Sequence, residues 1–199
     1  MNRIRMAGWA AAMVLAVGAG SMNAQMRDWK LDPSHSDADF AVKHMGISTV
    51  HGSFRGISGV IHLDPANLAH SAVEATIDVR TVDTGVEVRD THLRSAEFFD
   101  VAKYPTMTFK SSSIAKSGSG YALTGDLTMH GVTKQVVLNM EAPDKEEVDA
   151  KGVAHRGFSA TTTVNRRDFG LTYNGMLKSG DMTVGDDVKI ELNVEVVNQ

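Results

Sequence analysis

Hydrophobic and polar residues alternate with a period of two along most of the chain after residue 28. Val73, Ala75 and Ile77 are separated by polar residues, and so are Ile190, Leu192 and Val194. Successive side chains of a β-strand point to opposite faces, so this pattern is typical of half-buried strands. It recurs over residues 29–31, 38–44, 60–63, 73–79, 107–109, 121–129, 136–140, 158–164 and 188–196. We therefore predict an all-β fold of roughly eight or nine strands.

Turn residues separate these segments. Asp64-Pro65 ends one of them, Ser117-Gly118-Ser119-Gly120 predicts a flexible hairpin and His130-Gly131 a tight one, because glycine accepts positive φ at no steric cost. Residues 142–152 are rich in Asp, Glu and Lys, and we interpret them as a solvated hairpin connection. Long antiparallel strands with one apolar face either stack as a sandwich or close into a barrel, and the periodicity permits both.

One segment breaks the alternation. Thr84 and Glu87 have the spacing of a helix capping box, and residues 86–93 can form two helical turns. Phe98, Phe99 and Tyr104 follow within a few residues. They predict either a plug over one end of a barrel or an ordinary crossover whose aromatic residues join the main core.

The N-terminus has the three parts of a secretory signal. Arg3 and Arg5 precede an apolar stretch at residues 7–20, and Ala24 ends the segment. A membrane-spanning helix needs about 20 apolar residues, and this stretch is shorter. We expect a signal peptide at residues 1–24, cleaved near Ala24, and one domain at residues 25–199. The protein is therefore expected in the periplasm, with no stable membrane insertion.

Charge and cysteine usage exclude several classes of function. Residues 1–24 hold two of the 20 Lys and Arg residues and none of the 24 Asp and Glu residues, so their removal changes the formal net charge from −4 to −6. An acidic chain favours neither a phosphate backbone nor an anionic membrane surface, and nucleic acid is therefore not expected as a partner. The chain has no cysteine, which excludes disulfides, thiolate metal sites and covalent haem attachment.

Motifs of common enzyme classes are missing. The chain has no G-x-S-x-G sequence, no P-loop and no dinucleotide-binding fingerprint, and Asp168-Phe169-Gly170 occurs without the other parts of a kinase. The eight histidines show no short-range ligand spacing, so we expect neither a metal nor another cofactor, although ligands from separate strands remain an alternative.

His44 shares the parity of Phe40 and Val42. An imidazole on an inward apolar face needs a hydrogen-bond partner, which is either another protein group or the polar end of a ligand. Arg94 allows the same two interpretations, the structural one being an ion pair with Asp90 or Glu97.

Four ordered runs of sequence resemble the YceI-like family of exported lipid-binding proteins. They are Trp29–Ser36 with its continuation to Gly59, His92–Phe109, Thr124–Lys134, and Arg166–Gly170 with Gly185–Val188. The resemblance implies an extended, lipocalin-like, eight-stranded antiparallel β-barrel with a short helical plug segment. It also implies a periplasmic protein that forms homodimers and holds a long apolar ligand: a polyisoprenoid, a quinone tail or a fatty-acid derivative.

We predict the ligand-contacting residues from strand parity, aromatic character and position in these runs. They are Phe40, Val42, His44, Phe54, Arg94, Phe98, Phe99, Tyr104, Met107, Phe109, Leu127, Met129, Phe158 and Phe169.

The expected function is that of a non-catalytic carrier that shields such a lipid from water. Two alternatives stay open: an enzyme acting on the lipid, with His44, His92 or Arg94 near the pocket, and a stress-related structural protein with a closed core. A titratable group within about 3 Å of a second polar group inside the cavity would favour the enzyme. The absence of a cavity would favour the structural protein.

Overall fold

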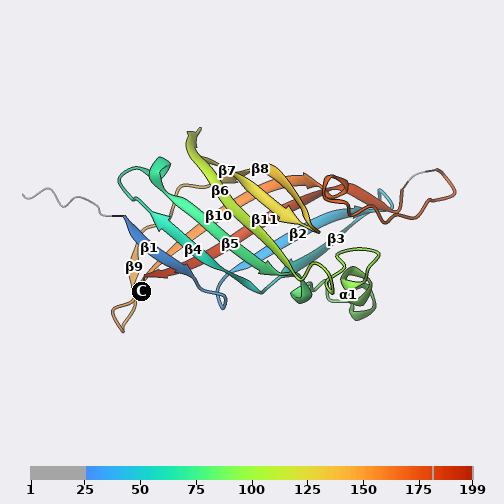
Figure 1. Cartoon of the computed structure of the whole chain (residues 1–199), viewed down its shortest axis with the longest axis horizontal. Helices are drawn as coiled ribbons and strands as arrows, with labels where there is room; N and C mark the ends of the chain where they lie inside the picture. The colour runs from blue at the N-terminus through green and yellow to red at the C-terminus, as the bar shows by residue number, and fades with distance from the viewer. Residues whose placement is uncertain (1–25, 181, 199) are drawn as a thin grey trace, which may run out of the picture.

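The computed structural model describes residues 26–180 and 182–198, which form mostly β-strand (Figure 1). The strands are β1 Arg27–Leu31, β2 Asp37–His44, β3 Ser48–Phe54, β4 Ile57–Leu63, β5 Ala72–Asp78, β6 Thr106–Ser117, β7 Gly120–Met129, β8 Val132–Met140, β9 Glu147–Val148, β10 Ala154–Asn165 and β11 Val184–Asn198. The helix α1 spans Glu87–Arg94, and 3-10 helices span Leu68–His70, Val79–Thr81 and Arg166–Phe169. The expected signal peptide and its cleavage point near Ala24 lie outside the described residues.

The last strand closes the sheet into a barrel because it pairs along both of its edges. One edge of β11 pairs with β10 from Asp187 to Val197. The other edge pairs with β2 near the start of β11 and with β1 near its end. From β1 the ring continues through β4, β5, β6, β7, β8 and β10, all antiparallel. The prediction of an eight-stranded antiparallel barrel, rather than a sandwich, is confirmed.

The predicted alternation decides which side chains face the interior. On β5, Val73, Ala75 and Ile77 point into the barrel, whereas Glu74 faces outward and forms an ion pair with Lys110 of the neighbouring strand at 2.7 Å. The tight turn predicted at His130-Gly131 joins β7 to β8. Both residues have positive φ, 51° and 75°, as a two-residue hairpin turn of this kind requires.

β3 was not predicted from the sequence. This strand pairs with β2 over seven residue pairs and extends the barrel wall toward the end that carries α1 (Figure 1). Gly52 interrupts its apolar pattern, and the reason is steric: a Cβ on Gly52 would lie 2.4 Å from the ring of Phe40. Because the ring of Phe40 on the neighbouring strand occupies this space, residue 52 has no side chain, and the alternation that would indicate a strand is broken.

The predicted short helix is present, but its predicted capping box is wrong. Val86 occupies the N-cap position and makes no side-chain capping hydrogen bond. Thr84 instead donates its backbone N–H to the buried carboxylate of Asp90 at 2.9 Å and its hydroxyl at 2.5 Å. These bonds fold the segment before α1 back onto the helix. Within the described residues, no helix has the length and hydrophobicity needed to cross a membrane.

Arg166 holds the long loop between β10 and β11 against the barrel. Its guanidinium is buried, with 4% of the residue exposed, and donates hydrogen bonds to the backbone carbonyls of Leu171, Tyr173, Val184 and Gly185. It also bonds Asp186 at 3.1 Å. One side chain thus satisfies carbonyls at both ends of the loop. Its burial lowers the pKa of the guanidinium from its ordinary value.

Replacing Arg166 with methionine is expected to lower the free energy of unfolding by about 3 kcal/mol, because buried carbonyls lose their donors. Equilibrium unfolding in urea measures the change. Arg167→Met is the matched control, since Arg167 belongs to the same loop and contacts the same Asp186 but is 46% exposed. Equal losses in the two variants would contradict the anchoring role.

Candidate functional site

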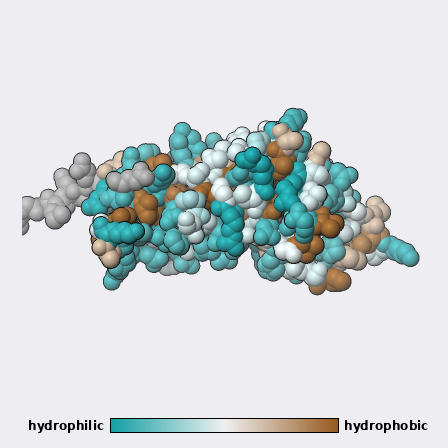
Figure 2. All heavy atoms as spheres, turned by 90° about the horizontal axis from the view of Figure 1, so that it is seen from below, coloured by the Kyte–Doolittle hydropathy of each residue, from teal (hydrophilic) through white to brown (hydrophobic). Residues whose placement is uncertain are grey.

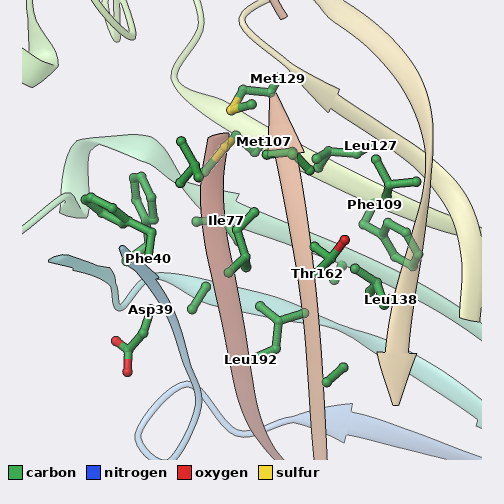
Figure 3. A pocket seen from close by; sticks show the side chains of 18 of the residues that line it. Asp39, Phe40, Ile77, Met107, Phe109, Leu127, Met129, Leu138, Thr162 and Leu192 are labelled. Atoms are coloured by element: carbon green, nitrogen blue, oxygen red, sulfur yellow. The ribbon is translucent and has the colours of Figure 1, made fainter. Parts of the chain in front are cut away.

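The barrel encloses an elongated apolar cavity of about 460 Å³, within the usual size of small-molecule sites. Its wall is built from residues of β1 to β8, together with β10, β11 and part of α1. Figure 3 shows Ile77, Met107 and Leu192 from three different strands directed toward the same space. The described structure therefore does not have the closed core expected of a purely structural protein.

Most residues predicted to contact a ligand line this cavity. Eleven of them do so: Phe40, Val42, His44, Phe54, Phe98, Phe99, Met107, Phe109, Leu127, Met129 and Phe158. Strand parity identified eight of the nine on strands, because a closed barrel turns one face of every strand inward. Phe54 lies on β3, which was not predicted, and it was chosen for its aromatic character and its place in a family run. Contact with a ligand stays a prediction for each of them.

The structure places the other three predicted residues away from the cavity. Arg94 donates to Glu87 at 2.8 Å, and not to Asp90 or Glu97 as expected. Tyr104 packs on His130, with ring centroids 4.5 Å apart. Phe169 is 2% exposed within the packed core. Each of these three side chains, which had been assigned to a ligand, instead contacts a protein neighbour that the sequence does not indicate.

The aromatic segment after α1 packs against the barrel at the end that carries α1. Phe99 packs edge-on against Phe54 at 5.6 Å, and Phe54 in turn contacts Phe40 at 5.6 Å, which ties this segment to the cavity wall. Phe98 stacks with Tyr173 of the β10–β11 loop at 4.7 Å. Phe98 and Phe99 thus line the cavity at this end, and Phe99 also packs against the core.

The two ends of the cavity differ in chemistry. At the far end the lining residues Leu31, Leu63 and Met140 are buried. At the end near α1 the lining includes polar and solvent-accessible side chains, which are Lys43, His44, Arg89, His92, Tyr173 and Thr183. The cavity therefore has a closed apolar end and a polar mouth.

Arg89 and Tyr173 at this mouth were not identified from the sequence. Arg89 is fixed by Thr84, to which it donates from Nε at 2.6 Å and from Nη2 at 2.9 Å. Tyr173 reaches the mouth because Arg166 holds its backbone carbonyl. Neither residue belongs to an alternating strand, so no local pattern could have indicated its position.

Titratable groups of the cavity lie at its rim or point away from it. His92 Nε2 lies 2.6 Å from Glu97 Oε2, and that carboxylate is 65% exposed to solvent. Asp39 is the one acidic residue among the lining, and Figure 3 shows its carboxylate turned away from the apolar side chains. Burial raises the pKa of Asp39, and the nearby Asp37 raises it further. The interior thus offers apolar surface, with no acid–base pair directed into it among the described residues.

Among the described residues, one group has donor atoms close enough together to hold a metal ion: Asp32, His35 and Glu195. It lies outside the cavity lining, and His35 has a side chain that is 64% exposed. Hydrogen bonds within the protein account for the geometry. Asp32 accepts from the backbone of Ser34 at 2.8 Å and lies 2.9 Å from His35 Nδ1, and His155 bonds Glu195 at 2.7 Å.

This turn is expected to respond to pH through Asp32 and His35. The hydrogen bond and charge of Asp32 raise the pKa of His35 above 6.5, and Glu195 adds to the shift. The hydrogen bond from His35, and then that from Ser34, lowers the pKa of Asp32 below 3.8. The stability due to His35 is complete below pH 6.5 and is lost as the pH rises through its folded pKa. The stability due to Asp32 is lost as the pH falls through its own folded pKa.

An NMR titration of the imidazole of His35 tests this pair. We expect a midpoint above 6.5 in the native chain and a downward shift in Asp32→Asn, because the substitution removes the largest cause of the raised pKa. An unchanged midpoint would show that Asp32 does not control His35.

Comparison with known proteins identifies the relatives of this chain. The model of the YceI-like domain matches residues 29–196. A UPF0312 protein of Vibrio cholerae is 36% identical over 195 residues, which is 96% of both chains. Protein YceI of Escherichia coli O157:H7 is 36% identical over 187 residues, 93% of both chains.

Solved structures show the same fold. BcnA of Burkholderia cenocepacia matches with a TM-score of 0.72 at 25% identity and covers 83% of this chain and 98% of its own. A polyisoprenoid binding domain from Saccharophagus degradans matches with a TM-score of 0.62 at 17% identity, over 88% of this chain and 100% of its own. With the family model spanning nearly all of the barrel, the chain belongs to the YceI-like family.

Proposed function

We propose that this protein is a periplasmic carrier that binds a long apolar chain, such as a polyisoprenoid, a quinone tail or a fatty-acid derivative, inside its barrel. The observation that carries the proposal is the cavity of about 460 Å³, apolar along its length and polar at one mouth. The polyisoprenoid binding domain of Saccharophagus degradans has the same barrel, which supports this class of ligand. The signal-like N-terminus supports export.

The driving force follows from the chemistry of the wall. Each CH₂ group moved from water to an apolar lining contributes about 0.8 kcal/mol, so a long chain binds without directional contacts. The methionines Met107, Met129 and Met140 add flexible thioethers to the lining, which can adapt to ligands of different shape. Selectivity then depends on chain length and on the polar groups of the mouth.

Binding fits the site better than catalysis does. The polyisoprenoid binding domain that shares this fold supports binding. The close pair formed by His92 and Glu97 lies at the rim, where Glu97 is largely exposed to solvent. A lipid chain inside the barrel would therefore contact apolar side chains along most of its length.

Mass spectrometry of a solvent extract tests the proposed function directly. Protein purified without detergent from an expressing bacterium is expected to release an isoprenoid, quinone or fatty-acid derivative in a ratio near one per chain. An extract without lipid, together with no binding of added decaprenol or cis-parinaric acid, would falsify the carrier proposal.

Filling the cavity is expected to block binding without unfolding the barrel. Ala75 is a small inward-facing residue of β5, and Ala75→Phe places a ring in the space of the ligand. We expect the affinity for cis-parinaric acid to fall about tenfold or more, since a filled cavity can no longer bury the chain.

Thr76→Phe is the matched control for Ala75→Phe. Thr76 is the next residue of the same strand and does not line the cavity. The same ring added outside the barrel should leave the affinity unchanged. Thermal unfolding of both variants checks that the fold persists, and equal affinities in the two would place the binding site elsewhere.

A further inference from the structure

Exposed apolar side chains gather at the open end of the barrel. Ten large apolar residues are exposed among those that the structure describes, and five of them belong to two segments, residues 45–47 and residues 173–182: Met45, Ile47, Tyr173, Met176 and Met182. Ile47 is 82% exposed and Met176 is 74% exposed. Figure 2 shows hydrophobic surface at the end of the molecule opposite the grey trace. We call these five residues the apolar rim.

The two segments of the rim are joined to each other, and they adjoin the mouth of the cavity. The backbone N–H of Met45 donates to the carbonyl of Thr183 at 2.7 Å, which joins the two segments. Met176 and Met182 pair across the longer loop. Tyr173 of this loop lines the cavity, and so do Thr183, which follows the loop, and His44, which precedes the shorter segment. In Figure 1 the longer loop is the far tip of the molecule, beyond the strands.

The two segments that contain the rim carry little charge on an otherwise acidic chain. Residues 45–47 have no charged side chain, and the sequence 173–182 has one lysine, Lys178, and one aspartate, Asp181. The chain from residue 25 on has a formal net charge of −6. An anionic surface would therefore repel most of the molecule and accept this end, which would orient the barrel with its mouth toward the surface.

We propose that the apolar rim docks onto a phospholipid bilayer, with Ile47 and Met176 inserted at the boundary between headgroups and acyl chains. This inference rests on the proposed function, because it names the surface from which the lipid is loaded. A lipid chain that crossed water would lose about 0.8 kcal/mol for each CH₂ group. A cavity mouth placed in the bilayer surface removes this main barrier to moving the lipid from the bilayer into the barrel. Tyr173 suits this position, since its ring is apolar and its hydroxyl can stay hydrated.

Flotation with vesicles tests the docking. The full chain is expressed with its own N-terminus, and its mass is measured so that retention of the apolar stretch at residues 7–20 is detected. The protein is then mixed with vesicles of phosphatidylethanolamine and phosphatidylglycerol, free of isoprenoid. We expect the native chain to float with the vesicles at low and at high salt, because the attraction is mostly apolar.

The double variant Ile47→Asn/Met176→Asn is expected to lower the bound fraction about tenfold, since two aliphatic side chains no longer enter the bilayer. The control Val137→Asn/Val148→Asn also replaces two exposed aliphatic residues, 46% and 61% exposed, on β8 and β9 away from the mouth. It should float like the native chain. Equal loss in both double variants, or no flotation of the native chain, overturns the docking proposal.

Two further measurements separate docking from lipid binding and from self-association. Decaprenol binding in solution should be equal in the native protein and in all variants. If none of them binds decaprenol, the carrier function is overturned. If they bind decaprenol but the native protein does not float with vesicles, the docking alone is overturned. Sedimentation velocity without vesicles should show no association that depends on Ile47 and Met176. If it does, the rim is a surface for a second copy of the chain, and the bilayer is the wrong occupant.

Discussion

The architecture depends on one constraint: β11 forms backbone hydrogen bonds along both of its edges, which joins the two ends of the sheet. β10 occupies one edge over eleven residue pairs, from Asn165 to His155. The other edge is shared, because β1 pairs only with residues 196–198 and β2 takes the earlier part of the strand. The hairpin of β2 and β3 therefore extends beyond the ring at one end, and that end becomes the mouth.

Ring closure also produces the cavity. Every strand turns one face inward, and several inward residues, among them Ala38, Ala75 and Ala160, are too small to meet across the barrel. Long apolar residues would fill such a space and give a closed core. The same alternation that makes the strands recognisable in the sequence thus leaves an apolar volume that a flexible lipid can occupy.

Most of the strands could be predicted from the sequence because they follow from local alternation, as on β5 and β11, and the same alternation placed most of the predicted ligand-contacting residues on the cavity wall. Features that depend on tertiary partners could not. Gly52 breaks the apolar pattern of β3 because the ring of Phe40 fills the space of a side chain there, and Phe169, which was assigned to the ligand, packs into the core instead. Arg89 and Tyr173 reach the mouth through hydrogen bonds made by Thr84 and Arg166, residues whose partners are set by the fold.

The difference between the two ends gives a bound lipid a direction. The buried end is lined by Leu31, Leu63 and Met140, where a polar headgroup would lose its hydration without finding a partner. At the mouth, His44 and Lys43 are accessible and can solvate such a group. A ligand with one polar end is therefore stable in one orientation, with its tail inside and its headgroup at the rim. Under the docking proposal, an isoprenoid would enter from a bilayer whose lipids have their headgroups outermost, so it would have to turn or slide past Ile47 and Met176.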